Sequence, residues 1–342
     1  MSKSLRVGLV GCGAMGQAHL SVWQKIPIAQ VTAICDPNLE RAKSAGDPIG
    51  AVAFVGLEEM CASGLIDAID ISTPSGMHAD QGMVGARHGL HVLVEKPVDL
   101  VIAKAEALVD ACESAGVTLG CIFQRRTFTG AQQVVDAISQ GKLGQILSIN
   151  ASVKWFRPQS YYDSAAWRGT HALDGGVLAN QAIHALDHVC WLVGAPEKVE
   201  YAHCATVAHE MECEDFAVAV VRFKSGALGT IEATTCCSPD LCSRIELFGT
   251  KGSVMFEDAT VKKFGIDGVD LLHTIGQPNE VIGGGSVPMS ISLRGHEILF
   301  ADFADAVLTG RSPMVSGRAA LESVALLNMI YAASGQQIGS SK

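Results

Sequence analysis

Short apolar runs alternate with helix-like stretches over the first third of the chain, up to about residue 121. The helix-like stretches cover residues 38–46, 57–63, 77–89 and 101–115, and the apolar runs cover residues 5–10, 30–35, 51–55, 66–73, 91–95 and 118–123. Alternation at this spacing is typical of βαβ units, which build a parallel sheet with right-handed crossovers. Such sheets bind ligands beyond the carboxyl ends of their strands, so we expect the chemistry of this part just after the apolar runs.

The pattern changes from about residue 146, where apolar and polar positions begin to alternate with a period of two. Strand-like runs lie at residues 146–155, 198–207, 215–223, 227–235 and 243–249, with few helices between them. We therefore predict an α/β protein with a doubly wound parallel sheet in residues 1–123 and an α+β domain with an open, mostly antiparallel sheet in residues 124–342. The last helices are expected in the second domain or packed back on the first. An open sheet leaves one apolar face uncovered, which favours a homodimer or homotetramer.

A glycine-rich run, GCGAMG at residues 11–16, follows the first apolar run and opens a helical pattern. Gly11 permits a tight turn, Gly13 lets the backbone approach a pyrophosphate, and Gly16 permits close packing of helix on strand. The helix N-terminus offers further N–H groups to the phosphates. Asp36 ends the next apolar run, 20 residues past Gly16, where a carboxylate accepts hydrogen bonds from a ribose and repels a 2′-phosphate. The sequence therefore predicts a Rossmann domain that binds NAD, with NADP less favoured.

Glu95-Lys96-Pro97 directly follows an apolar run on the side where the ligand is expected. The ammonium group of Lys96 could donate to a substrate hydroxyl and stabilise the alkoxide that forms as hydride leaves. The alternative is a surface lysine at a turn, which is the usual position of lysine. The place in a βα turn favours the first interpretation.

A second candidate cluster lies in residues 174–196, where a helical pattern runs between Gly175-Gly176 and Gly194. Asn180, His184 and His188 stand four residues apart and are expected on one helix face. A histidine can take a hydroxyl proton near neutral pH, and an asparagine one turn away can orient the ring or the substrate. A histidine in a mostly apolar helix is more often part of the core, and we assign His188 there. Periodicity alone does not decide His184.

Composition narrows the function classes. The net charge is −10 and no cluster of Lys or Arg occurs, which disfavours nucleic acid as a partner. No run approaches the roughly 18 apolar residues of a membrane span, and the N-terminus lacks a secretion signal. The eleven cysteines then indicate reduced thiols and a cytoplasmic location. Their spacing contains no CxxC pair, so we expect core cysteines and no metal site.

After the glycine run and Asp36 come TPSGMH (73–78), VEKP (94–97), QRR (124–126), WRGT (167–170), GGVLANQAIHALD (175–187) and LFGTKGSVMFED (247–258). This order of motifs resembles the Gfo/Idh/MocA family of NAD(P)-dependent sugar and cyclitol dehydrogenases. The match runs nearly end to end. The resemblance implies a Rossmann domain followed by an open-sheet domain that covers the nicotinamide and often mediates oligomers.

The resemblance also implies roles for single residues. Lys96 would be the catalytic lysine and His184 the acid/base histidine, assisted by Asn180. The cofactor would contact the loop that includes Cys12, Ala14 and Met15, together with Ser72, Thr73, Pro74, His78, Glu95 and Lys96. Candidate walls of the sugar pocket, beside Lys96, Asn180 and His184, are Gln124, Arg125, Trp155, Arg157, Trp167 and Arg168. Each of these six could instead be a structural surface or interface residue.

Two positions depart from the commoner family pattern, which has aspartate where Asn180 stands and glycine where Ala182 stands. An asparagine version is found in some branches, including enzymes that oxidise sugar nucleotides. Replacing aspartate by asparagine removes a negative charge near His184 and should lower the pKa of the histidine.

We therefore expect an NAD-dependent dehydrogenase that oxidises a secondary hydroxyl of a small polyhydroxylated substrate: a sugar, a sugar derivative or a cyclitol. Two alternatives stay open. The same fold uses NAD transiently in glycoside cleavage, and some relatives bind the dinucleotide as regulators without turnover.

Overall fold

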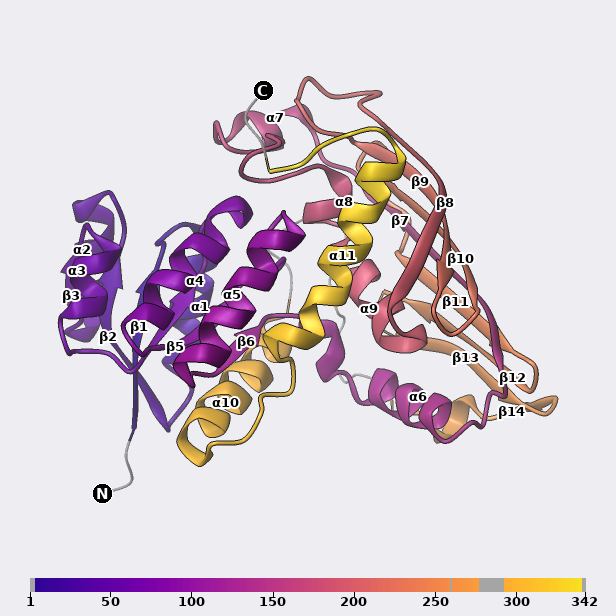
Figure 1. Ribbon diagram of the computed structural model, residues 1–342, viewed down its shortest axis with the longest axis horizontal. Coiled ribbons are helices and arrows are strands. Elements are labelled where there is room, and N and C mark those ends of the chain that lie inside the picture. Colours follow the sequence, from indigo (N-terminus) through magenta and orange to yellow (C-terminus); the bar gives the residue numbers. More distant parts are fainter. Residues whose placement is uncertain (1–3, 259, 277–291, 340–342) are drawn as a thin grey trace. The chain divides into compact units, whose positions relative to one another are not determined.

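A parallel six-stranded sheet forms the first part of the chain (Figure 1). The computed structural model describes residues 4–258, 260–276 and 292–339. The sheet has the order β3-β2-β1-β4-β5-β6, with all neighbouring strands parallel. Its strands are β1 (Leu5–Val10), β2 (Ala29–Cys35), β3 (Val52–Phe54), β4 (Ala68–Ile71), β5 (His91–Val94) and β6 (Leu119–Cys121). Each half of the sheet runs outward from the β1–β4 pair, which is the doubly wound Rossmann arrangement that the sequence predicts.

The helices of this unit are α1 (Ala14–Trp23), α2 (Leu39–Gly46), α3 (Leu57–Ala62), α4 (His78–Arg87), α5 (Ile102–Ala115) and α10 (Arg294–Thr309). Strands such as β4 are buried over their whole length, because both faces of a parallel sheet are covered. Although α10 is remote in sequence, it packs against α1, with the rings of Trp23 and Phe300 4.6 Å apart. The first unit therefore comprises the chain through Gln124 and residues Leu293–Leu321.

The second unit comprises Arg125–Ser292 and the chain from Glu322, so the division falls inside α11 (Gly317–Ala333). It contains an eight-stranded sheet of order β14-β13-β12-β11-β7-β10-β9-β8, visible in pink to orange tones in Figure 1. The strands are β7 (Ile146–Lys154), β8 (Pro196–Ala205), β9 (Phe216–Phe223), β10 (Leu228–Thr234), β11 (Arg244–Gly249), β12 (Gly252–Glu257), β13 (Thr260–Ile266) and β14 (Val269–Asp270). Only β7 and β10 pair in parallel, so the prediction of a mostly antiparallel sheet is confirmed.

Helices cover one face of this sheet. They are α6 (Thr129–Ser139), α8 (Val177–Asn180) and α9 (Ile183–Val193). Helix α9 packs on β7, and α6 packs on β13. The short helix α7 (Gln159–Asp163) follows β7 in the chain. Burial alternates along β9 and β11, as a sheet with one covered face requires. On the outward face four large apolar side chains are 39–59% exposed: Tyr201, Val220, Leu228 and Phe248. Over the described residues, no helix combines the length and the apolar character needed to cross a membrane.

Candidate active site

The glycine loop after β1 has the shape that a dinucleotide requires. Gly11 has a φ of +91°, and a Cβ on Gly16 would lie 2.0 Å from the carbonyl oxygen of Gly11. A Cβ on Gly13 would meet no atom within 4 Å, and no side chain caps the start of α1 at this residue. This open space in front of the α1 N–H groups fits a pyrophosphate. Ala14 and Met15 are exposed here, whereas the side chain of Cys12 is buried and can contribute only its backbone.

Asp36 lies at the end of β2 and is only 3% exposed. Its carboxylate accepts hydrogen bonds from the backbone N–H groups of Cys12 (3.0 Å) and Asn38 (2.9 Å). A carboxylate has about four acceptor sites, so ribose hydroxyls can still bind. The guanidinium of Arg41 lies 3.6 Å from the same carboxylate, a cation that the sequence analysis did not consider.

Hydrogen bonds connect the loops after β4 and β5 to each other and to the glycine loop. Ser72 donates from its hydroxyl to the carbonyls of Val10 and Gly11 (both 3.1 Å), which joins β4 to the glycine loop. The ring nitrogens of His78 lie 2.7 Å from the Pro97 carbonyl and 2.9 Å from the Thr73 carbonyl. His78 is 1% exposed, and burial lowers its pKa. His78 therefore holds two loops in place, and its contact with the cofactor stays a prediction, while Thr73 and Pro74 are half-buried.

Glu95 also points inward, into a fully buried charge network. His19 in α1 faces a carboxylate at each ring nitrogen: Asp70 at 3.0 Å and Glu95 at 3.1 Å. Both nitrogens must donate, so the ring is an imidazolium. Burial alone would lower the pKa of His19, but Asp70 and Glu95 outweigh it and raise the pKa to about 10. Trp23 donates to Asp70 (2.7 Å), and His296 of α10 lies 3.7 Å from Glu95.

This network fixes the backbone of Lys96. Burial would raise the pKa of Glu95, but hydrogen bonds to His19 and His296 hold it well below its usual range. The second oxygen of Glu95 accepts from the backbone N–H of Lys96 (3.0 Å). Glu95 is 7% exposed and supports the backbone of Lys96, and its contact with the cofactor stays a prediction. Lys96 itself is half-buried at the end of β5, where a ligand of this sheet would lie.

His19, Asp70 and His296 were not predicted from the sequence. An aspartate inside the apolar run 66–73 was a usable signal, because a buried carboxylate needs a partner. The partner could not be read from the sequence, since the three residues lie in β4, α1 and α10.

In the second unit the helical pattern of residues 177–193 is interrupted, contrary to the prediction of one helix. The backbone N–H of Ala182 donates to the carbonyl of Val177, five residues earlier, and this wide turn separates α8 from α9. Within residues 177–190 only Asn180 and His184 are not buried. His188 is 1% exposed and packs on Phe256, with ring centroids 4.7 Å apart, and burial with Arg125 and Arg126 lowers its pKa to about 3. His188 is therefore a core residue, whereas Asn180 and His184 reach the surface.

Glu214 holds the start of α8. Its carboxylate is fully buried and accepts from Leu178 N–H (3.0 Å) and from the hydroxyl of Tyr331 (2.9 Å). A Cβ on Gly176 would lie 2.2 Å from the backbone and carboxylate oxygens of Glu214, so only glycine fits here. Burial raises the pKa of Glu214 to about 7. The glycines stand out in the sequence, whereas the acid that they accommodate does not.

Four of the predicted wall residues gather around Tyr161 of α7. The guanidinium of Arg168 lies 4.1 Å from the Tyr161 ring centroid and 4.6 Å from that of Trp167. The guanidinium of Arg157 lies 5.5 Å from Tyr161 and 5.7 Å from Trp155. These distances are within the range of cation–π contacts. The cluster thus combines two cations with aromatic faces.

The other two wall residues do not join this cluster. Gln124 is the last residue of the first unit. Arg125 is 8% exposed, donates to the hydroxyl of Ser243 (3.3 Å), and burial lowers its pKa. Arg125 is therefore buried beside Ser243, and its place in a pocket wall stays a prediction.

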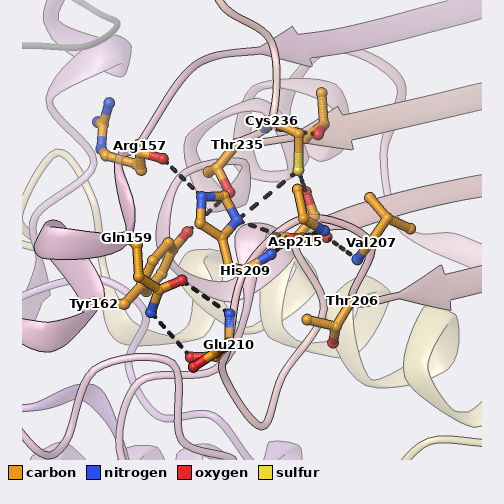
Figure 2. Close-up of polar contacts among 12 residues, drawn as sticks. Arg157, Gln159, Tyr162, Thr206, Val207, His209, Glu210, Asp215, Thr235 and Cys236 are labelled. Carbon is orange, nitrogen blue, oxygen red and sulfur yellow. Dashed lines mark hydrogen bonds and ion pairs between the residues drawn. The ribbon is translucent and has the colours of Figure 1, made fainter.

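A hydrogen-bond network fixes the segment that carries Arg157 (Figure 2). His209 is 2.7 Å from the Arg157 carbonyl at Nε2 and 2.8 Å from the Asp215 carboxylate at Nδ1. Gln159 makes two side-chain bonds to the backbone of Glu210 (2.9 and 3.1 Å). Cys236 lies 4.0 Å from His209, and burial raises the pKa of its thiol. We interpret these potential metal ligands as a structural network, because Asp215 also accepts three backbone N–H bonds.

Comparison with known proteins identifies both units. Residues 5–123 match the oxidoreductase family with an NAD-binding Rossmann fold, and residues 131–255 match the GFO/IDH/MocA C-terminal domain. The WlbA dehydrogenase of Bordetella pertussis, solved with NADH and UDP-GlcNAcA, is 35% identical over 97% of both chains with a TM-score of 0.85. The Chromobactrium violaceum WlbA, solved with the same two molecules, is 30% identical over 99% of this chain and 96% of its own, with a TM-score of 0.88. The myo-inositol 2-dehydrogenase of Thermotoga maritima is 26% identical over 74% of this chain and 75% of its own. The chain therefore belongs to the GFO/IDH/MocA family and is an NAD-dependent dehydrogenase.

Proposed function

We propose that this dehydrogenase oxidises a secondary hydroxyl group of a sugar, a sugar derivative or a cyclitol. The observation that carries the proposal is the exposure of His184 together with Asn180, in a stretch whose other residues are all buried. An imidazole that reaches the surface from a rigid helix is suited to general base catalysis. The family membership and the fixed backbone of Lys96 support the same assignment.

The proposed roles follow from the chemistry of each group. His184 accepts the hydroxyl proton, and the Lys96 ammonium donates to the same oxygen and stabilises the negative charge that develops on it. Asn180 orients the substrate or the imidazole. NAD, when bound, accepts the hydride. Its pyrophosphate would be held by the loop of Gly13, Ala14 and Met15, and its ribose by Asp36.

The cluster around Tyr161 supports a substrate that carries anionic groups. Arg168 is half-buried and presents a cation over the rings of Tyr161 and Trp167, whereas Arg157 is only 6% exposed and adds positive charge behind them. Such a surface suits a sugar acid or a nucleotide-linked sugar. The two WlbA structures that contain UDP-GlcNAcA agree with this substrate class. A neutral cyclitol is the second candidate, because the relative from Thermotoga maritima is named a myo-inositol 2-dehydrogenase.

The test is formation of NADH, measured by fluorescence over inositols, hexoses, anhydrosugars, sugar acids and UDP-linked sugar acids, with NAD and NADP in parallel. On the substrate found, Lys96→Ala and His184→Ala should each lower kcat about 100-fold or more while NADH binding persists. Normal turnover by His184→Ala would contradict the assignment. Cleavage of a glycoside without accumulation of NADH would favour the glycosidase alternative. Tight NADH binding without turnover over the whole panel would favour a regulator.

We further propose that the outward face of the second sheet joins copies of the chain into a dimer or tetramer. Tyr201 and Val220 are direct neighbours across β8 and β9, and both are exposed with Leu228 and Phe248. Apolar faces of this kind are usually covered by association. Light scattering at low concentration tests this, with Val220→Glu as the disrupting variant. A monomer in the wild type would remove the proposal.

A further inference from the structure

Arg168 differs from the other arginines of the chain in how its charge is balanced. Three arginines are buried: Arg125, Arg126 and Arg157. Eight are exposed, and each has a carboxylate oxygen 2.6–3.7 Å from its guanidinium: Arg6, Arg41, Arg87, Arg222, Arg244, Arg294, Arg311 and Arg318. Arg168 is half-buried, and over the described residues it has no such ion pair. In a chain with a net charge of −10, a guanidinium at the surface that pairs with no carboxylate is available to an anionic ligand.

The neighbours of Arg168 hold its guanidinium and leave its outer nitrogens accessible. The guanidinium lies over the rings of Tyr161 (4.1 Å) and Trp167 (4.6 Å), and Nε donates to the hydroxyl of Ser164 (3.1 Å). Within the part of the chain that the structure describes, no group accepts a hydrogen bond from Nη1 or Nη2. These two nitrogens carry the parallel N–H groups with which an arginine binds a carboxylate or a phosphate through two hydrogen bonds.

The turn that carries Arg168 is fixed from the interior of the second unit. Asp174 is 1% exposed, and one of its carboxylate oxygens accepts from the backbone N–H of Gly169 (2.8 Å). The other oxygen accepts from the side-chain amide of Asn180, which is also hydrogen-bonded to the side chain of Tyr161. The ring and the guanidinium are therefore held in place before a ligand binds, which lowers the entropy cost of binding.

Arg157, the second cation near Tyr161, is not suited to the same task. It is only 6% exposed, and its guanidinium donates to the carbonyl of Phe156 (2.8 Å). Its centre lies 5.5 Å from the Tyr161 ring, against 4.1 Å for Arg168. Arg157 therefore adds positive charge behind the ring, and Arg168 is the cation that a ligand can reach.

We propose that Arg168 is a specificity-determining residue, whose Nη1 and Nη2 groups bind one carboxylate or phosphoryl group of the substrate, and that Tyr161 is a positioning residue that holds its guanidinium. The inference rests on the proposed function for the kind of substrate: a sugar acid supplies a carboxylate, and a nucleotide-linked sugar supplies a phosphate. Both groups offer two oxygens that share a negative charge. A neutral sugar or cyclitol offers none, so it would gain no such contact from Arg168.

Equilibrium binding tests the proposal without turnover. The full chain, saturated with NADH, is titrated by calorimetry with UDP-glucuronic acid, UDP-glucose and glucuronic acid. Arg168→Met should weaken the binding of at least one of these anionic ligands about 10- to 100-fold. A loss confined to the two glucuronic acid ligands would identify the carboxylate as the bound group, and a loss confined to the two UDP ligands would identify the phosphate. If none of the three binds the wild type more tightly than it binds Arg168→Met, the inference is overturned.

Further variants distinguish a matched pair of N–H groups from simple positive charge. Arg168→Lys keeps the charge but not the two parallel N–H groups, so it should recover only part of the affinity. Tyr161→Leu should weaken the same ligand about 2- to 5-fold, and Tyr161→Phe, which keeps the ring, should bind like the wild type. Arg318→Met is the matched control and should bind normally, because Glu113 pairs with Arg318 at 2.6 Å. Full affinity in Arg168→Lys, or an equal loss in Arg318→Met, would overturn the proposal.

The same measurements separate this inference from the proposed function. Weakened anion binding in Arg168→Met together with normal turnover by His184→Ala would overturn the proposed base and support the role of Arg168. Unchanged anion binding in Arg168→Met together with an inactive His184→Ala would overturn the role of Arg168 and support the proposed base.

Discussion

Lys96 and the helix of His184 are supported by two different kinds of buried acid. Behind Lys96, Glu95 is ionised and faces the imidazolium of His19, so charge is matched by charge. Behind α8, Glu214 faces the phenol of Tyr331 and the N–H of Leu178, which are neutral donors, and burial raises its pKa to about 7. A buried acid with only neutral partners titrates near neutral pH, whereas one with a cationic partner does not. The first support should therefore be strong and constant near pH 7, and the second weaker and dependent on pH.

Removing His19, the cation of the network behind Lys96, should have the largest effect on the free energy of unfolding. His19→Ala leaves Asp70 and Glu95 buried without their cation, and we expect the free energy of unfolding to fall by about 3–5 kcal/mol. Equilibrium denaturation in urea at pH 7 measures it. Lys25→Met removes a cation 2.6 Å from Glu297 but 58% exposed, and it should cost at most about 1 kcal/mol. Equal losses in the two variants would contradict the comparison.

The pH dependence of the same support has a definite sign. Because the pKa of His19 is raised from 6.5 to about 10, its stabilisation is fully present below about pH 6.5 and is lost as the pH rises through about 10. In alkaline solution, where the carboxylates are ionised in both proteins, the difference in stability between the wild type and His19→Ala should therefore shrink as the pH rises through about 10. A difference that grows above pH 8 would exclude a protonated His19.

Glu214→Gln should have the next largest effect on the free energy of unfolding. The way this effect changes with pH distinguishes the support of α8 from the support of Lys96. The pKa of Glu214 is raised from 4.5 to about 7, so the folded state favours the neutral acid and loses stability as the pH rises between these values. Glutamine keeps an acceptor for Tyr331 and Leu178 but cannot ionise. Relative to the wild type, the variant should gain up to about 3 kcal/mol between pH 4.5 and 8. A constant difference over this range would show that Glu214 stays ionised.

The first unit was more predictable from the sequence than the second, and the reason is physical. The glycine loop, Asp36 and Lys96 each carry a local requirement: a positive φ, space beside a backbone, or a place at a strand end. Such requirements leave a pattern within a few residues. His19, Asp70 and His296 have no such pattern, because only the folded sheet and α10 bring them together.

In the second unit the local pattern was misleading. Residues 177–193 have the apolar spacing of one helix, and neither Gly nor Pro marks the break at Gln181 and Ala182. The wide turn there satisfies the backbone with a bond over five residues, which apolar periodicity cannot distinguish from a regular helix. The sequence predicted His184 as a candidate, but it did not predict Glu214, the buried acid that holds the start of α8.

The smallest expected effect concerns Asp36, an acid whose cationic partner is exposed. Arg41 lies 3.6 Å from Asp36 and is 54% exposed, so solvent weakens the pair. In Asp36→Asn the repulsion of a 2′-phosphate is lost and Arg41 becomes available to it, and we expect the preference for NADH over NADPH to fall about 10- to 100-fold. Quenching of protein fluorescence by each nucleotide measures the two Kd values. Adding Arg41→Ala to Asp36→Asn should weaken NADPH again and leave NADH nearly unchanged. If NADPH binds equally well without Arg41, the arginine has no part in cofactor choice and the preference depends on Asp36 alone.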